Sequence, residues 1–383
     1  MNSPSHAEID SHSPAAAPPG GMVRVRRQWQ AMATRLDVEL VGADVEHLEA
    51  VAAAIEDETH RLDALLSRFK PASEISRLNR RAADEAVRVD ADLWQLLCQA
   101  EHFRRATDGF FDVAAASAAA AELKNGTGSE QRRASAETNA GREVPVPIFQ
   151  HAGQHGAPRL QLDAARQTVR FASAGVVVDL GAIGKGFVLD RAKEILARYG
   201  VERALVSAGT SSILAVGRPA PGTTWMVDVR HPLDDGANPI AQLELVDQSL
   251  SCSATLRPGQ AESDIVDPHT GLPLAGGEAV VVLAPTGTEA EALSTALLAM
   301  GRGRAAEYLA RGDSTKSLSE SPRGLSQFCA VRGAKWDCPP LPDGSRIDSK
   351  VEVAWIDGAS PLPNPQRSNP QCPNLDWLIR SHD

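Results

Sequence analysis

The sequence lacks the features that mark several large classes of protein. Its five cysteines are scattered and form no C-x-x-C pair, which fits reduced thiols and argues against a zinc site. No apolar run is long enough to span a bilayer, so we expect no transmembrane segment. The formal net charge of -10 argues against a phosphate-backbone partner. We therefore expect no nucleic acid binding.

The two ends and one internal stretch show no apolar periodicity. Residues 1–21 are rich in Pro, Ala, Ser and Gly and have no apolar segment of the secretory kind, which predicts a disordered leader and a cytoplasmic protein. Residues 121–157 are polar and glycine-bearing, which predicts a surface insertion. We expect one domain over 22–308 and a weakly ordered tail over 309–383, parts of which are held by Trp336, Trp355 or Trp377.

The remaining chain is organised around the stretch 175–200. Val176–Val178 is β-branched and apolar, which predicts a buried strand, and glycines at 181, 184 and 186 lead into an apolar-periodic helix that ends at Gly200. Two interpretations of the glycines stay open. They allow either a tight turn with close helix packing, or a phosphate site at the helix start to which Lys185 adds charge.

Further strands and helices are expected on both sides of this stretch. The segment 71–79 is expected to be a loop in which Ser73 and Ser76 act as caps, and 240–245 is expected to pair with 249–254. Helices are expected at 44–69, 91–107 and 289–300, a hairpin at 160–171, and strands at 29–42, 203–206, 225–229, 240–245, 249–254 and 279–284.

Several polar residues have both a chemical and a structural interpretation. Glu291 and Thr295 share a helix face and have the oxygen ligands that Mg²⁺ or Ca²⁺ prefer; the alternative is a solvated Glu and a Thr bonded to its own helix. Asp264 and Asp267 are either an acid and base pair or turn formers. Asp112 suits a turn cap, and Cys252 suits a small buried side chain better than a nucleophile.

The order of the motifs resembles the ApbE family, the FAD:protein FMN transferases. The resemblance runs from about Met32 to Met300, and its most specific segments are DLGAIGKG and IVDPHTG. The segments in chain order are Met32-Ala33-Thr34, SEISRLN (73–79), TDGFFD (107–112), VDLGAIGKGFVLD (178–190), SAGTS (207–211), DIVDPHTG (264–271) and AEALSTAL (290–297).

The resemblance implies a mixed α/β fold that binds FAD as substrate, with Mg²⁺ at the pyrophosphate. It also implies transfer of FMN through a phosphoester bond onto a Thr or Ser of a flavin-accepting protein, with release of AMP. Chemically, an in-line attack on phosphorus depends on a metal and a glycine turn more than on a protein nucleophile. The alternative is a non-catalytic flavin-binding relative that has lost the general base.

The resemblance also assigns site residues. Asp264 takes the place of the general base for the acceptor hydroxyl. The metal ligands are the Ala182 carbonyl, Glu291 and Thr295. The flavin nucleotide is contacted by residues from four segments, namely Met32, Phe111, Asp112, Asp179, Lys185, Ile265 and Val266.

The chain departs from the family pattern at five places. Asp264 replaces a histidine, and a carboxylate is a weaker base than an imidazole near pH 7. Glu291 replaces an aspartate and is longer by one methylene. The other three departures are Met-Ala-Thr for MGT at 32–34, Gly-Thr-Ser for GGD at 209–211, and Cys-Ser-Ala for TSG at 252–254.

Overall fold

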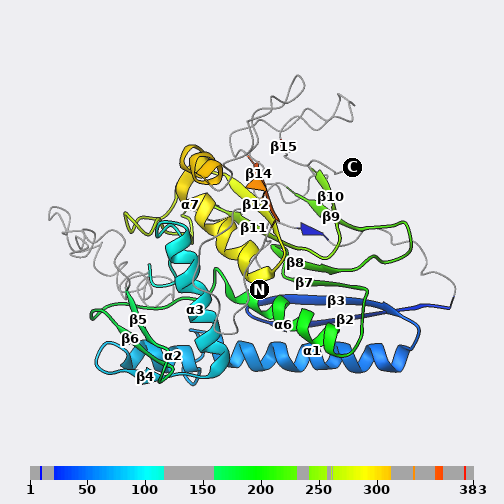
Figure 1. The fold of residues 1–383 in the computed structure, drawn as a ribbon, viewed down its shortest axis with the longest axis horizontal. Coiled ribbons are helices and arrows are strands. Elements are labelled where there is room, and N and C mark those ends of the chain that lie inside the picture. Colours follow the sequence, from blue (N-terminus) through cyan, green and yellow to red (C-terminus); the bar gives the residue numbers. More distant parts are fainter. Residues whose placement is uncertain are drawn as a thin grey trace, which may run out of the picture. The chain divides into compact units, whose positions relative to one another are not determined.

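The computed structural model describes residues 9–10, 21–115, 159–230, 241–256, 260, 262–311, 331–332, 350–356 and 375–376 (Figure 1). The chain divides into two compact units, which are described separately. The first contains residues 1–63, 181–265 and 273–383, and the second contains 64–180 and 266–272. The expected insertion at 121–157 and most of the expected leader at 1–21 lie outside the described residues.

A large antiparallel sheet forms the centre of the first unit. Its strands join segments that lie far apart in the sequence, because the last strands of the chain lie beside β12 while the first ones lie beside β7. In spatial order the strands are β13 (Val331–Arg332), β14 (Lys350–Ile356), β12 (Ala279–Ala284), β11 (Ser249–Ala254), β8 (Ser212–Val216), β7 (Ala204–Ala208), β3 (Thr34–Gly42) and β2 (Val23–Ala31), with β15 (Leu375–Asp376) also paired to β14.

A small second sheet covers one face of the large sheet. It consists of β1 (Ile9–Asp10), β9 (Trp225–Val229) and β10 (Ala241–Leu245), all antiparallel. Alternate residues of both sheets, among them Leu205, Val227 and Val281, form one buried core cluster. This is the expected period of two for strands buried on one face. The prediction that 240–245 pairs with 249–254 is wrong, because β10 pairs with β9 and β11 pairs with β8 and β12.

Helices α6 (Gly184–Arg198) and α7 (Gly287–Arg311) pack against strands of the large sheet, α6 on β7 and β8, and α7 on β8, β11 and β12. The helix predicted from the central stretch is confirmed: its apolar side chains are buried, and Gly200 ends it with a φ of 68°. Tyr199, which follows the last residue of the helix, is 47% exposed. Helix α7 is interrupted at Gly301, where φ is 69°.

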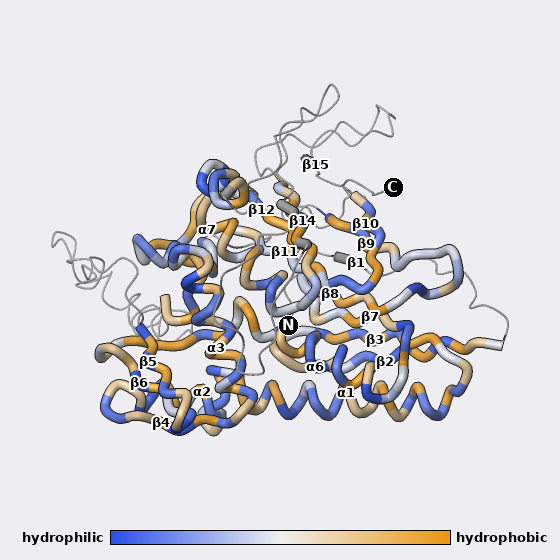
Figure 2. The backbone as a smooth tube through the Cα atoms, viewed as in Figure 1, coloured by the Kyte–Doolittle hydropathy of each residue, from blue (hydrophilic) through white to orange (hydrophobic). Residues whose placement is uncertain are grey.

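The first helix, α1 (Val45–Leu66), confirms the amphipathic pattern predicted for 44–69. Figure 2 shows hydrophobic and hydrophilic residues alternating along it, and its apolar residues Leu48, Val51, Ile55 and Leu62 are buried. Among the described residues, none of the helices is both long enough and apolar enough to cross a membrane.

The expectation of a weakly ordered tail is wrong for Lys350–Ile356. This segment is strand β14, and it pairs with β12 from Glu352 to Ile356. Its side chains from Val351 to Ile356 are mostly buried, and Trp355 is 8% exposed. Trp355 therefore holds part of the tail, as predicted, whereas Trp336 and Trp377 lie outside the described residues.

The second unit contains a small sheet and two further helices. The sheet consists of β4 (Val87–Arg88), β6 (Thr168–Phe171) and β5 (Leu160–Asp163), which confirms the hairpin predicted at 160–171. Helix α3 (Ala91–Ala106) confirms the helix predicted at 91–107. The loop expected at 71–79 is mostly helix α2 (Glu74–Arg81), because the Ser73 hydroxyl accepts a hydrogen bond from the Ser76 N–H and caps it.

The strand predicted at Val176–Val178 is wrong. Only residue 176 makes a bridge, and the backbone from Val177 to Leu180 is irregular. The Asn79 side chain takes the place of a neighbouring strand: its Nδ2 donates to the Val178 carbonyl and its Oδ1 accepts from the Val178 N–H, both at 2.9 Å. A single side-chain amide thus satisfies the buried backbone that a sheet would otherwise pair.

Candidate functional site

Four motif segments of the first unit meet at the start of helix α6. The β2–β3 hairpin turns at Met32 and Ala33, whose φ angles of 54° and 56° are left-handed. A Cβ added at Gly184 would lie 3.2 Å from Met32 Cε, so the hairpin tip packs on the first turn of the helix. The SAGTS turn joins this group through the Gly209 N–H, which donates to the Arg35 carbonyl at 2.7 Å.

Glu291 is the carboxylate at the centre of this group, which we call the α6-start site: Met32, Gly184–Gly186, Ser212, Glu291 and Thr295. Its side chain is 3% exposed and has three donors. The Lys185 ammonium lies 2.7 Å from Oε1, the Ser212 hydroxyl donates to Oε1 at 2.6 Å, and the Gly186 N–H donates to Oε2 at 2.8 Å. Helix α6, which has no side-chain cap of its own at Ile183, is thus capped by α7.

Asp190 makes the reverse contact. From α6, its carboxylate accepts hydrogen bonds from the Gly287 N–H at 2.6 Å and the Thr288 N–H at 3.0 Å, and also from the Thr288 hydroxyl at 2.5 Å. Burial raises the pKa of Asp190 to about 6, against the opposing effect of these hydrogen bonds and of Lys193. The two helices therefore cap one another, each through a carboxylate on its own second turn.

The glycines between the two helix starts are needed for close packing. A Cβ added at Gly186 would lie 2.2 Å from the Gly287 carbonyl oxygen, and one added at Gly287 would lie 2.6 Å from the Gly186 carbonyl oxygen. No side chain fits such a backbone contact. Of the two interpretations of the glycine segment, close helix packing therefore accounts for Gly186.

A chain of hydroxyl groups connects α7 to β11. Ser253 Oγ lies 3.2 Å from Thr295 Oγ1 and 2.8 Å from Ser294 Oγ, and Ser251 Oγ lies 3.0 Å from Ser294 Oγ. Ser294 donates back to the Glu291 carbonyl at 3.1 Å. The structural alternative for Glu291, a solvated carboxylate, is wrong, because the side chain is buried and paired.

The donor chemistry around Glu291 suits a hard cation. The described residues contain no group of three or more His, Cys, Asp or Glu arranged to hold a metal, so a divalent ion here would rely on one carboxylate and neutral oxygens. Carboxylate, hydroxyl and carbonyl oxygens are the ligands that Mg²⁺ prefers. In this structure the positive charge beside Glu291 is the Lys185 ammonium, which lies against Oε1, one of the two oxygens that such an ion would bind.

Asp264 lies at the surface of the first unit. Its carboxylate accepts a hydrogen bond from Gln260 Nε2 at 2.9 Å. The next residue, Ile265, is half-buried and donates its N–H to Ser263 Oγ at 3.0 Å. Asp267, in the second unit, accepts from the His269 N–H at 2.8 Å, as a turn former does. The structure therefore favours the turn interpretation for Asp267, whereas Asp264 is exposed.

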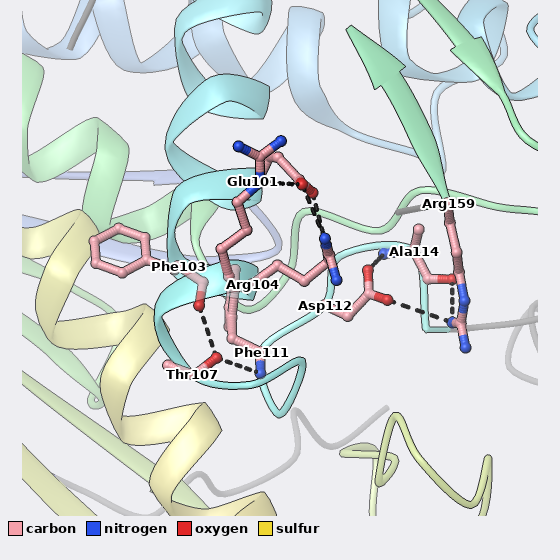
Figure 3. Close-up of polar contacts among 9 residues, drawn as sticks. Glu101, Phe103, Arg104, Thr107, Phe111, Asp112, Ala114 and Arg159 are labelled. Carbon is pink, nitrogen blue, oxygen red and sulfur yellow. Dashed lines mark hydrogen bonds and ion pairs between the residues drawn. The ribbon is translucent and has the colours of Figure 1, made fainter. Parts of the chain in front are cut away.

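Asp112 lies in the second unit beside Arg159, and Figure 3 shows the contacts of both. Its Oδ1 accepts from the Ala114 N–H at 2.8 Å, which confirms the predicted turn cap. Its Oδ2 lies 3.6 Å from Arg159 Nη1, and that guanidinium also donates to the Ala114 carbonyl at 2.7 Å. Burial raises the pKa of Asp112, although Arg159 and Arg104 act in the opposite direction.

Phe111 is part of the core of the second unit. It is 1% exposed, and its ring packs edge-on against Phe103 at a centroid distance of 6.3 Å. The Thr107 hydroxyl fixes its backbone, accepting from the Phe111 N–H at 3.0 Å while donating to the Phe103 carbonyl at 2.7 Å (Figure 3). In this structure Phe111 therefore faces the core, and its predicted contact with a flavin stays a prediction.

Two motifs that are 161 positions apart in sequence meet at His269. Its ring stacks on Phe110 with a centroid distance of 4.2 Å and an interplanar angle of 22°. Its Nε2 lies 3.1 Å from the Asp108 carbonyl oxygen, and because a carbonyl oxygen only accepts, Nε2 is the donor of this hydrogen bond. The DGFFD and DPHTG segments thus contact each other within the second unit, through His269.

The remaining predicted residues of the second unit are Asp179 and Val266. Asp179 Oδ2 lies 3.0 Å from Arg68 Nε, an ion pair whose alignment is not that of a hydrogen bond. The Arg68 guanidinium in turn lies 4.3 Å from the centroid of the Phe69 ring. Val266 is half-buried. The unit boundaries fall after Leu180 and after Ile265, so each of the two most specific motifs contributes residues to both units.

Sequence analysis missed several residues that organise these contacts. Asp190 and Asn79 lie inside motifs that resemble the family, but no local signal marks their side chains as partners of distant backbone groups. Ser212 and Arg159 lie in segments without a distinctive pattern. The sequence does not indicate that Lys185 pairs with Glu291, because 106 positions separate them and the resemblance assigns one to the nucleotide and the other to the metal.

The fold and the site together define an α+β protein with a large antiparallel sheet and two mutually capped helices. The same fold is found in a solved structure from Vibrio cholerae described as flavin transferase ApbE, with a TM-score of 0.62 and 18% sequence identity. The alignment covers 93% of this chain and 97% of that one.

Sequence comparison gives the particular family. The profile of the ApbE family matches residues 32–318, and the chain belongs to this family. It is 27% identical over 271 residues to an FAD:protein FMN transferase of Haemophilus influenzae, covering 68% of this chain and 74% of the relative. It is 30% identical over 259 residues to a protein of the same name from Treponema pallidum, covering 62% and 68%.

Proposed function

We propose that the protein is an FAD:protein FMN transferase, which moves FMN from FAD onto a Thr or Ser hydroxyl of a target protein and releases AMP. The observation that supports this most directly is the family match over residues 32–318, together with relatives of that name aligned over 74% and 68% of their own lengths. The contacts at the α6 start give the proposal a physical basis, because they gather a lysine and a helix N-terminus.

In the proposed reaction, the acceptor oxygen forms a bond to the phosphorus of the FMN moiety. The bond between that phosphorus and the bridging oxygen breaks, and AMP leaves with the bridging oxygen. The hydroxyl proton passes to a base. No redox partner is needed, and all charge that develops is on phosphate oxygens, which cationic groups and backbone N–H groups stabilise.

The residues assigned by family resemblance would each have a task in this reaction. Lys185, with the start of α6, would bind phosphate oxygens. The ring and ribityl chain of the flavin would be bound by the residues that the resemblance assigns to it, namely Met32, Phe111, Asp112, Asp179, Ile265 and Val266.

A Mg²⁺ ion, when bound, would neutralise charge on the pyrophosphate. Glu291, Thr295 and the carbonyl of Ala182 would hold it, and their oxygen chemistry fits such an ion. The longer Glu291 side chain also reaches Ser212 and Gly186, so two of its hydrogen bonds fix the carboxylate in place.

Asp264 is the proposed base for the acceptor hydroxyl. It lies at the surface, where a target protein can reach it. A carboxylate is already ionised at neutral pH but takes up a hydroxyl proton less readily than an imidazole does. We therefore expect slow transfer by the natural protein, with Asp264→His faster by up to about 10²–10⁴-fold and Asp264→Asn slower.

The experiment is incubation of the purified protein with FAD, Mg²⁺ and a Thr- or Ser-bearing acceptor peptide, with AMP measured by chromatography and the peptide by mass spectrometry. Equal amounts of AMP and flavinylated peptide would support the proposal. FAD binding without AMP, from both the natural protein and Asp264→His, would favour the non-catalytic flavin-binding alternative. Glu194→Ala, which changes an exposed residue of α6, serves as the control.

A further inference from the structure

In this structure the cation that pairs with Glu291 is a side chain of the protein, the Lys185 ammonium. Lys185 Nζ lies 2.7 Å from Glu291 Oε1, and the lysine side chain is 22% exposed while the glutamate side chain is 3% exposed. The other two donors are a serine hydroxyl on β8 and a backbone N–H of α6, both fixed by secondary structure. Lys185 is therefore the one partner of this carboxylate that is both charged and able to swing away on a flexible side chain.

A divalent ion bound by Glu291 would compete with the Lys185 ammonium for the same oxygen. Oε1 already accepts from Ser212 at 2.6 Å, and two cations within bonding distance of one oxygen repel each other strongly. If the ammonium leaves, the carboxylate still keeps its hydrogen bonds from Ser212 and Gly186, so its position does not depend on the lysine. During an exchange of one cation for another, the buried carboxylate therefore keeps two hydrogen-bond donors.

We propose that a divalent metal ion displaces Lys185 from Glu291, and that the released ammonium then binds a phosphate of the flavin nucleotide. This inference rests on the proposed function for the identity of the nucleotide. It makes Lys185 a positioning residue that links two ligands: the metal frees the lysine, and the nucleotide gives it a new partner. By thermodynamic reciprocity, each ligand then strengthens the binding of the other by the same factor.

The exchange predicts opposite effects of one substitution on two affinities. Lys185→Gln removes the competing charge, so Mn²⁺ should bind more tightly in the absence of nucleotide, by about tenfold, within the range usual for coupled sites. The same variant should bind FAD more weakly. It should also lose most of the mutual strengthening, since no ammonium remains to be handed from one partner to the other.

The test measures Mn²⁺ binding by electron paramagnetic resonance, with and without FAD, and needs no acceptor peptide. Lys193→Gln is the matched control, because Lys193 lies two turns further along α6 and contacts the Pro285 carbonyl at 3.2 Å instead of Glu291. Glu291→Gln should abolish Mn²⁺ binding. Lys185→Arg keeps the positive charge and should therefore keep the natural Mn²⁺ affinity. A change in affinity that occurs in Lys185→Gln but not in Lys185→Arg then reflects the lost charge and not a folding defect.

A second measurement follows the lysine directly. Reductive methylation with mass spectrometry should show Lys185 of the natural protein becoming more reactive when Mg²⁺ is added, while Lys193 does not change. Mn²⁺ affinity in folded Lys185→Gln that is equal to or weaker than that of the natural protein would overturn the inference, as would unchanged Lys185 reactivity at saturating Mg²⁺. Because both measurements omit transfer, a protein that exchanges cations but transfers no flavin would refute only the proposed function.

Discussion

The starts of helices α6 and α7 are capped in the same way but by carboxylates in different surroundings. Glu291 caps α6 and has a lysine ammonium, a serine hydroxyl and one backbone N–H as donors. Asp190 caps α7 and has two backbone N–H groups and a threonine hydroxyl, with no cation in direct contact among these donors. One buried charge is thus compensated by a mobile cation and the other by fixed dipoles.

This difference separates a site that can exchange partners from one that cannot. Fixed N–H groups have no alternative position without unfolding of the helix start, so Asp190 is suited to a structural task. The Lys185 ammonium can leave Glu291 while the helix stays intact, so Glu291 is suited to binding another cation. The functional interpretation of the α6 start depends on this contrast, which the following experiments test in order of decreasing effect.

Gly186→Ala should break both caps at once. Its Cβ would lie 2.2 Å from the Gly287 carbonyl oxygen, and a backbone atom cannot rotate away as a side chain can. We expect a loss of unfolding free energy of about 3 kcal/mol, at the upper end of the range for overpacking. Chemical denaturation provides the measurement. Gly303→Ala, in α7 with no atom within 4 Å of the added Cβ, should be neutral or stabilising by up to about 1 kcal/mol.

Asp190 should make stability depend on pH in a window that its raised pKa defines. The folded-state pKa of about 6 lies above the reference value of 3.8, so the folded protein binds the proton more tightly than the unfolded chain does. Its contribution is therefore complete below about pH 4 and is lost as pH rises through about 6. Between pH 4 and 7 we expect the contribution of Asp190 to the free energy of unfolding to fall by about 2 kcal/mol.

The control for this pH effect is Asp190→Asn, which cannot titrate. The difference in unfolding free energy between the natural protein and Asp190→Asn should be largest at pH 4 and should shrink toward pH 7. Groups shared by the two proteins cancel in that difference. A difference that grows with pH would mean that the three donors outweigh burial and that the pKa of Asp190 is lowered.

Helix α6 was predictable from sequence because its signals are local. Apolar residues at helical spacing and a terminal glycine specify residues 184–198 without any distant partner. The caps were not predictable, because Gly186 and Glu291 are 105 positions apart and any of several carboxylates had the right chemistry. Family resemblance indicated that Glu291 belongs to the site, but it did not indicate the pairing with Lys185.

Strands were predicted less well, since a strand depends on partners elsewhere in the chain. Val176–Val178 has the composition of a buried strand, yet its backbone is satisfied by Asn79, which lies 99 positions away from Val178. Conversely, Val351, Val353 and Trp355 alternate with polar or small residues within a polar tail, and that short pattern was overlooked. Both errors have one cause, because the composition of a segment does not determine which other segment pairs with it.

Ser212→Ala should weaken the α6 cap while leaving the α7 cap intact. The fully buried Ser212 hydroxyl donates to Glu291 Oε1 at 2.6 Å, and hydrogen bonds to charged groups are worth about 1.5–3 kcal/mol. We expect a loss of about 1.5 kcal/mol in urea denaturation. Ser211→Ala removes the neighbouring hydroxyl, which lies 3.4 Å from Ser212 Oγ, and should change stability by less than about 0.5 kcal/mol.

The smallest expected effect concerns the hairpin tip that packs on the α6 start. Ala33 has a φ of 56°, a left-handed conformation that a Cβ disfavours, at the position where the family pattern has glycine. Ala33→Gly should therefore stabilise the protein by about 0.5–1 kcal/mol, since relief of strain exceeds the added flexibility of the unfolded chain. Thermal denaturation can measure this gain.

Ala54→Gly gives the opposite case for the same exchange of residues. Ala54 lies inside helix α1, where glycine costs about 1 kcal/mol because the backbone conformation is one that alanine prefers. Opposite signs for the two variants would assign the effect at position 33 to its backbone conformation. Destabilisation by Ala33→Gly would instead mean that the Ala33 methyl group contributes packing at the hairpin tip that outweighs the strain, and the α6 start would then depend on that contact as well as on its carboxylate cap.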